Sequence, residues 1–488
     1  MLESVGNNIW LEGAEQGSGS QQEIMALQKA IIANDNVTDV ANLQNGAALG
    51  KQSLEGTLVK LLWDMKHLVL WNKIQKIKAY AIVEEYSVQD GYGQGTDGFQ
   101  DQLSISEEAD PTLFRDYALV KFIRQVYRVG DIATMVNNIT GPEMLAIEAA
   151  MRRALRITER SLWFGNSAVF PNSWDGIYAK LNTIGNVENI IDARGANISE
   201  EQIRTGAEII NVNYGNVSDL ICSNSVKTSI DTLYGPANYR VEQTAHPVNL
   251  SIGHSINEFK TSFGNGPITP SIFLNIEGKG VAKTKNSVGV IIEGKTNVKA
   301  PDTPSIALAA NTGVTGSLFA STGSGGAIAG AYRYRVSAVN DAGESAACAA
   351  SIGTVVAGGS ITITVTPAGT GEVATGYRIY REPTPNSGAG TERFLNEVAI
   401  ATLTYDDLNT ELPGTGIVFM MDLSASGENR SIAFKQLTPM YRQELARLDA
   451  SKRGFVGLYG TPVFYGMNKI VAIKNVASAA IRSNTLDL

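Results

Sequence analysis

Hydrophobic residues recur at helical spacing along the longest amphipathic stretch of the chain, residues 141–181. Five apolar positions follow at intervals of three, four and seven: Met144, Ile147, Met151, Leu155 and Leu162. This spacing places them on one stripe of a long helix. Gly141-Pro142 suits the helix start, because proline fits the first turn. Gly165-Asn166 is expected to end it, since both residues tolerate the left-handed conformation that a helix C-terminus needs.

The polar side of this predicted helix is rich in arginine. It carries Arg152, Arg153, Arg156 and Arg160, together with Glu148 and Glu159. Residues three and four apart are neighbours on a helix surface, so several acid–base pairs are expected. Taken alone, the stretch predicts a helix packed on a sheet, followed by a turn near Trp174-Asp175-Gly176.

A long polar segment separates two apolar segments that precede this helix. Residues 53–71 are amphipathic, and residues 72–88 have the composition of an extended segment. A Gly-rich, acidic stretch follows at 90–111, before aromatic and β-branched residues return at 114–136. The excursion is long enough to form a protruding loop or a twisted hairpin.

Helices and strands alternate after the long helix. Ser199-Glu200-Glu201 predicts a capped helix, 219–222 a buried strand and 225–233 another helix. Short strands are expected over 250–295. Near the C-terminus, residues 441–454 predict a charged helix ending at Gly454, and residues 455–476 predict two more strands.

A change of composition marks an insertion. No lysine occurs between Lys299 and Lys435, and Gly, Ala, Thr, Ser and Val dominate the segment between them. Short strands separated by Gly, Pro and Asn turns predict an all-β sandwich of about a hundred residues. The segment after it is too short to bury a core of its own, so the sandwich is expected to interrupt a domain.

Composition excludes several classes of protein. A chain of 488 residues is expected to form two to four domains. A net charge of -8 argues against a dedicated nucleic-acid binder, which needs a basic surface. The two cysteines, Cys222 and Cys348, do not support a disulfide framework, and they favour a reducing compartment. No apolar run approaches membrane-spanning length.

No convincing catalytic or metal-binding pattern is present. Residues 289–296 match the phosphate-loop pattern, but the Val and Ile residues inside it favour a strand. Residues 93–98 match GxGxxG without the apolar helix that a dinucleotide fold requires. The three histidines, His67, His246 and His254, are too few and too scattered for a zinc site or a catalytic triad. Glu84-Glu85 and Asp406-Asp407 are interpreted as solvated-face and turn residues. We therefore expect no enzyme activity, no cofactor, no metal and no catalytic residue.

The order of segments resembles the major capsid proteins of tailed bacteriophages, which have the Hong Kong 97-like fold. The resemblance lies in LVLWNKIQKIKAYAIVEEYSV, the Gly-rich loop, ERSLWFGN followed by PNSWDGI, then DLICSNSVKTSI and GLYGTPVFY. It covers most of residues 1–300 and 425–488. The strands AYRYRVSAVN and GYRIYRE resemble immunoglobulin-like or fibronectin type III modules.

The resemblance implies an α+β Hong Kong 97-like fold with an inserted immunoglobulin-like sandwich. The implied parts are an N-terminal arm at 1–52, a peripheral domain at 53–83 and 131–184 with a spine helix, an extended loop at 84–130, an axial domain at 185–300 and 422–460, the sandwich at 301–421, and C-terminal peripheral strands at 461–488. In a shell, Arg152, Arg153, Arg156 and Arg160 would contact a neighbouring subunit or face the genome.

The implied function is that of a major capsid protein, assembling in the host bacterial cytoplasm into the hexamers and pentamers of an icosahedral virion shell. The shell would enclose double-stranded DNA without sequence-specific binding or membrane contact. Portal, scaffold and decoration proteins are further candidate partners, and residues 301–421 are a candidate for weak glycan or host-surface contact. The alternative is a phage tail or baseplate protein, or a carbohydrate-binding adhesin, in which the sandwich is the working module.

Overall fold

The computed structural model describes residues 65–93, 99, 101–102, 110–136, 140–183, 187–234, 255–286, 290–321, 328–424, 430–447 and 449–477. All of these except Thr140 belong to one compact unit, residues 62–136 and 141–488. The expected N-terminal arm, His246, His254 and most of the GxGxxG match lie outside the described residues.

The predicted long helix is α6 (Pro142–Phe164), with Pro142 in its first turn. Its C-terminal half is buried through Leu155, Leu162 and Trp163, whereas Met144 at the other end is 75% exposed. The apolar stripe therefore enters the core over only part of its length. The expected reason for the helix stop was wrong: Gly165 has a φ of -57°, which is not left-handed. Glycine is required there because a Cβ would lie 2.4 Å from the carbonyl oxygen of Trp174.

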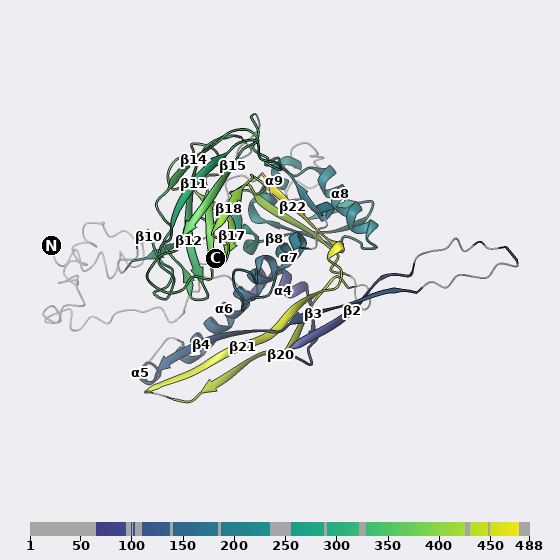
Figure 1. The fold of residues 1–488 in the computed structure, drawn as a ribbon. Coiled ribbons are helices and arrows are strands. Elements are labelled where there is room, and N and C mark those ends of the chain that lie inside the picture. The colour runs from purple at the N-terminus through teal and green to yellow at the C-terminus, as the bar shows by residue number, and fades with distance from the viewer. Residues whose placement is uncertain are drawn as a thin grey trace, which may run out of the picture. The chain divides into compact units, whose positions relative to one another are not determined.

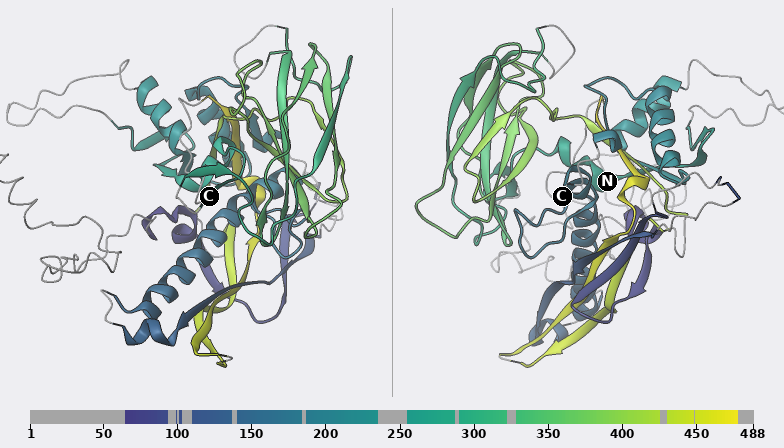
Figure 2. Two further views of the ribbon diagram at one scale, coloured as in Figure 1. Left: turned by 90° about the vertical axis from the view of Figure 1, so that its left-hand side faces the viewer. Right: turned by 45° about the vertical axis from the view of Figure 1, so that its right-hand side comes forward.

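A four-stranded sheet lies against α6 (Figures 1 and 2). Its strand order is β1-β20-β21-β4, with β1 parallel to β20 and the other pairs antiparallel. The strands are β1 (Gln75–Lys78), β20 (Ile432–Leu445), β21 (Ser451–Phe464) and β4 (Lys121–Gly130). The short helices η4 (Met65–His67) and α4 (Val69–Lys73) precede it, and α5 (Asp131–Met135) follows β4. The predicted charged helix at 441–454 was wrong, because most of this segment belongs to the β20/β21 hairpin. Tyr441–Leu445 pair with β21 and Ser451–Gly454 pair with β4, which is distant in sequence, so strand pairing replaces the helix.

A six-stranded mixed sheet forms the second layer, in the order β5-β22-β19-β6-β8-β7. Its strands are β5 (Ile190–Asp192), β22 (Ile470–Val476), β19 (Gly416–Met421), β6 (Asp219–Ser223), β8 (Gly264–Ser271) and β7 (Glu258–Thr261). The associated helices are α7 (Ile177–Thr183), η5 (Val187–Asn189), α8 (Glu200–Val212), α9 (Asn224–Tyr234), η6 (Ile272–Gly278) and η9 (Met467–Lys469). The predicted cap of α8 is present as a reciprocal Ser199–Gln202 capping box. One hydrophobic core joins α6 to both sheets, and Trp163 stacks on Phe419 with ring centroids 5.0 Å apart.

Residues 305–407 form two facing antiparallel sheets around a separate core, and we call this part the sandwich. One sheet contains β11 (Ser305–Asn311), β15 (Ser360–Thr366) and β18 (Thr404–Asp407). The other contains β13 (Gly343–Glu344), β12 (Gly330–Asn340), β16 (Gly376–Arg381) and β17 (Arg393–Ala399), with β14 (Ser351–Val355) also paired to β12. A small hairpin, β9 (Lys283–Lys285) and β10 (Ile291–Glu293), precedes it. We call the described residues outside 305–407 the body.

The strand pairing differs from the expected division of the C-terminal third. Residues 416–421 pair with β6 in the six-stranded sheet, so the sandwich ends before the expected residue 421. Residues 432–464 pair with β1 and β4, whereas residues 470–476 join the six-stranded sheet. The expected grouping placed 422–460 with the axial segments and 461–488 with the peripheral segments. The pairing instead joins 433–436 to 75–78 of the expected peripheral domain, 451–460 to 121–130 of the expected extended loop, and 472–474 to 190–192 of the expected axial domain. The mixture of helices and sheets confirms the predicted α+β class.

Candidate assembly surfaces and the sandwich junctions

A two-stranded hairpin, β2 (Val83–Gly91) and β3 (Thr112–Leu119), pairs with no other strand among the described residues. Strand alternation places Val83, Leu113, Tyr117 and Leu119 on one side of it, which we call the hairpin face. Leu113 is 65% exposed and Tyr117 is 62% exposed. The opposite side is partly covered, since Tyr86 lies edge-on against Tyr465. The same side also carries Glu85, Ser87, Gln89 and Arg115, so the face mixes apolar and polar groups. A two-stranded hairpin is at best marginally stable alone in water, so this open face suits a protein partner.

The four arginines of α6 do not form one exposed stripe. Arg152 pairs with Glu148 at 2.8 Å, and half-buried Arg160 lies near Glu344 and Glu397 of the sandwich. Arg153 is exposed, and its Nη2 lies 3.4 Å from the carbonyl oxygen of Val126. Arg156 is half-buried. Of the four, Arg153 is therefore the most available to a neighbouring molecule.

A buried charge cluster joins the sandwich to the body. Its members are Lys279 and Arg160 of the body with Glu344, Arg378 and Glu397 of the sandwich. Glu344 Oε2 lies 2.9 Å from Lys279 Nζ and 2.7 Å from Arg378 Nη1, while Glu344 Oε1 accepts hydrogen bonds from Ser337 and Tyr380. The Glu344 side chain is 4% exposed and that of Lys279 is 8% exposed. Sequence reasoning missed this cluster, because its members are far apart in the chain.

The cluster holds three cations and two carboxylates, and burial together with the charges of its neighbours shifts their pKa values. Burial lowers the pKa of Lys279 to about 8, and repulsion from Arg378 acts in the same direction. Burial and Arg378 also lower the pKa of Arg160 to about 10. Burial acts to raise the pKa of Glu344, but attraction to Lys279 and Arg378 outweighs it and holds that pKa well below its usual range. Glu344 is therefore charged at all physiological pH values.

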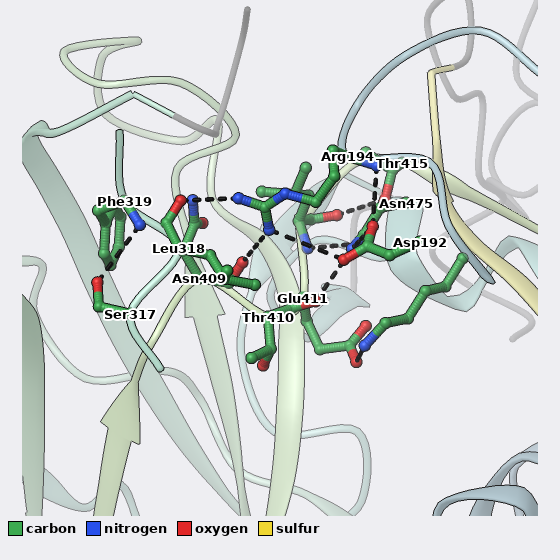
Figure 3. A network of polar contacts seen from close by, with 12 residues as sticks. Asp192, Arg194, Ser317, Leu318, Phe319, Asn409, Thr410, Glu411, Thr415 and Asn475 are labelled. Atoms are coloured by element: carbon green, nitrogen blue, oxygen red, sulfur yellow. Dashed lines mark hydrogen bonds and ion pairs between the residues drawn. The ribbon is translucent and has the colours of Figure 1, made fainter. Parts of the chain in front are cut away.

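A second polar junction links the sandwich to the six-stranded sheet (Figure 3). Arg194 donates to the carbonyl oxygens of Leu318, at 2.7 Å, and Asn409, at 3.1 Å. Asn475 accepts from the backbone N–H of Leu412 and donates to the carbonyl oxygen of Thr410. Of these partners Leu318 lies in the sandwich, whereas Asn409, Thr410 and Leu412 lie in the segment that follows its last strand, β18, so the contacts hold the sandwich and the chain leaving it against the six-stranded sheet.

Three residues of this second junction have left-handed backbone conformations. The φ angles are 52° for Arg194, 62° for Asn409 and 56° for Asn475. Asparagine adopts this region readily, but arginine does so at a cost of order 1–3 kcal/mol. The conformation of Arg194 is held by its guanidinium contacts to the carbonyl oxygens of Leu318 and Asn409 and by the hydrogen bond from its N–H to Asp192. The junction is therefore rigidly specified.

Three carboxylates interpreted as solvated, turn or surface groups are buried. Glu84 is 8% exposed and lies 2.9 Å from Lys435. Asp407 is 1% exposed and accepts from Arg381 and Tyr334. Glu159 is fully buried and accepts from Leu70, Trp71 and Trp163. Each interpretation was wrong because the partner comes from a strand, helix or loop distant in sequence.

The phosphate-loop match and the two cysteines noted in the sequence occupy ordinary structural positions. Within residues 289–296, Ile291–Glu293 form strand β10, and Lys295 pairs with Asp302. Cys222 and Cys348 are both buried free thiols. In the part of the chain that the structure describes, no three His, Cys, Asp or Glu side chains gather as metal ligands. No described helix has the length and hydropathy needed to cross a membrane.

Comparison with known proteins indicates the family. Residues 99–292 match the model of the SU10 major capsid protein family. A protein of Enterococcus phage phiEF24C is 22% identical over 461 residues, covering 88% of this chain and 90% of its own length. The major capsid protein of Staphylococcus phage K is 22% identical over 454 residues, covering 90% of this chain and 92% of its own length.

Similarity to solved structures is weaker. The capsid of a native GTA particle has a TM-score of 0.43 at 8% identity, covering 90% of this chain and 100% of its own. A chain from Gordonia phage Cozz has a TM-score of 0.44 at 7% identity, covering 90% and 96%. Scores this low carry no argument about fold, so the relationship rests on the sequences. The predicted resemblance is confirmed: over most of its length, this chain is similar in sequence to the major capsid proteins of bacteriophages.

Proposed function

We propose that the protein is the major capsid protein of a tailed bacteriophage, and that it assembles into the hexamers and pentamers of an icosahedral shell around double-stranded DNA. The observation that carries the proposal is the similarity to phage major capsid proteins over about nine-tenths of both chains. A partial match would fit a shared module, whereas a match of this extent includes both the body and the sandwich.

The hairpin face supports self-assembly. Leu113, Tyr117 and Leu119 are exposed on a hairpin that buries little within its own subunit. In a shell of identical copies, a neighbouring subunit can cover this face and so remove its apolar side chains from water, which favours association. The net charge of -8 also suits a container that must hold DNA without binding it tightly.

We assign the parts on a Hong Kong 97-like plan. In this assignment β2/β3 is the extended loop within residues 84–130, α6 is the spine helix, and β4, β20 and β21 complete the peripheral domain. The six-stranded sheet belongs to the axial domain in this assignment, and residues 416–421 and 470–476 form two of its strands. The sandwich is an immunoglobulin-like module on the outer surface, where it leaves the packaging volume free. Weak glycan or host-surface contact through residues 301–421 stays a prediction.

Electron microscopy of the expressed full-length chain tests the proposal. Closed icosahedral particles with surface protrusions, or isolated hexamers and pentamers, are expected. Tubes, small rings or a uniform trimer would instead indicate a tail or baseplate protein. A monomer that binds glycans and never assembles would indicate an adhesin.

A further inference from the structure

The buried charge cluster distributes its charges unevenly between the sandwich and the body. Both carboxylates, Glu344 and Glu397, belong to the sandwich, whereas Lys279 and Arg160 belong to the body. Without the sandwich, Lys279 would lose the carboxylate that lies 2.9 Å from its ammonium group. In the intact chain, loss of the Glu344 charge alone would leave the Lys279 ammonium group buried and without this partner, which is strongly destabilising.

Packing and backbone contacts reinforce this dependence. The backbone N–H of Phe394 in β17 donates to the carbonyl oxygen of Lys279 at 2.8 Å. Val169, in the loop after α6, is fully buried, and it lies so near Gly376 of β16 that a Cβ there would come within 2.6 Å of it. The Arg194 junction fixes the sandwich at a separate place on the body.

We infer that the sandwich and the body fold as one cooperative unit, and that Glu344 is the positioning residue that couples them. The sandwich is accordingly an integral part of the subunit and not a removable decoration. This inference does not depend on the proposed function, because it concerns the isolated chain.

The distribution of tryptophan allows a direct test. All five tryptophans precede residue 301, and Trp163 and Trp174 are buried in the body. Tryptophan fluorescence therefore carries no signal from the sandwich, and the buried Trp163 and Trp174 report unfolding of the body. Glu344→Gln, a substitution in the sandwich, is expected to lower the fluorescence-detected thermal midpoint of the full-length, unassembled chain by about 5 °C. Calorimetry is expected to show one transition that moves with the fluorescence.

The matched control is Glu293→Gln. Glu293 makes a bidentate pair with Arg335 of β12, at 3.1 Å and 2.7 Å, but its side chain is 42% exposed. The Glu293 carboxylate is partly solvated, and Arg335, whose side chain is 13% exposed, keeps its hydrogen bond to the carbonyl oxygen of Cys348, so this variant is expected to lower the midpoint by less than Glu344→Gln does.

A double variant covers the case in which Glu344→Gln does not fold. Lys279→Met together with Glu344→Gln restores the wild-type charge balance of the cluster, and it is expected to recover a soluble fold and at least half of the lost midpoint. The inference is overturned if the double variant is no better than Glu344→Gln. It is equally overturned if Glu344→Gln leaves the tryptophan-detected midpoint unchanged while a separate sandwich transition falls.

Discussion

The carboxylate of Glu159 in α6 accepts a 2.9 Å hydrogen bond from the backbone N–H of Leu70, 89 residues earlier in the chain. The same carboxylate accepts from the backbone N–H of Trp71 and from the indole of Trp163. It therefore holds the short helix α4 against the middle of the subunit core. The polar group predicted to lie on the helix surface is one of the most enclosed in the molecule.

Replacing Glu159 with Ala is expected to destabilise the subunit by about 2–4 kcal/mol, because two backbone N–H groups and an indole N–H lose their acceptor in a buried place. Urea unfolding followed by tryptophan fluorescence measures the loss. Glu148→Ala, in the half-exposed i,i+4 pair with Arg152, is the control and is expected to cost less than about 0.5 kcal/mol. Equal losses in the two variants would contradict the assigned role.

The same carboxylate predicts a pH dependence. Burial raises the pKa of Glu159 above its ordinary value of 4.5, although the hydrogen bonds from Leu70 and Trp71 act against this shift. The folded protein then binds this proton more tightly than the unfolded chain, so its contribution to stability falls as the pH rises above 4.5. Glu159→Gln removes the titration, and the variant is expected to show a shallower decline in unfolding free energy than wild type as the pH rises above 4.5. An unchanged slope would rule the shift out.

The contribution of Lys279 to stability is expected to rise with pH, in the alkaline range, whereas that of Glu159 falls with pH. Burial and the nearby Arg378 lower its pKa to about 8, below the 10.5 of an exposed lysine. The unfolded chain therefore binds this proton more tightly, and the stability contribution of Lys279 rises with pH between about 8 and 10. Lys279→Met is expected to remove this rise, as measured by urea midpoints at pH 8 and 9.5. A wild-type contribution that falls over this range would contradict the assigned cause.

The hairpin face predicts a separation of assembly from folding. Replacing Leu113 and Tyr117 with Ser removes exposed apolar area, so the unfolding free energy of the subunit is expected to change by less than about 1 kcal/mol. Particle yield by sedimentation or electron microscopy is expected to fall at least tenfold. Glu85→Gln is the control on the same side of the hairpin, because its pair with Arg115 is exposed and contributes little. Normal particles from the double variant would show that this face is not an assembly contact.

Arg153 provides a second test of the same kind. It is the exposed member of the four arginines of α6, so Arg153→Ala is expected to change subunit stability by less than about 0.5 kcal/mol and to lower assembly yield. Arg204→Ala, an exposed arginine on α8, serves as the matched control. If both variants assemble equally well, the arginine is an ordinary surface residue.

Local sequence signals predicted the local structure well. The proline at the first turn of α6 and the Ser199–Gln202 capping box act within one helical turn, so neighbouring residues suffice to specify them. The sandwich strands could also be predicted from the sequence, because the alternation of apolar and polar residues and the turn residues are short-range patterns. Residues 441–454 were misread as a helix, since residues 451–454 pair with β4, more than 300 positions earlier, and local sequence does not reveal that partner.

The sequence by itself determined the α+β class, the long helix, the inserted β segment and the resemblance to phage capsid proteins. Only the tertiary structure decided which charges are buried and which sheet each C-terminal strand joins. Glu344 and Glu159 show the physical reason: the cost of burying a carboxylate, and the partners that offset this cost, depend on residues brought together from distant parts of the chain.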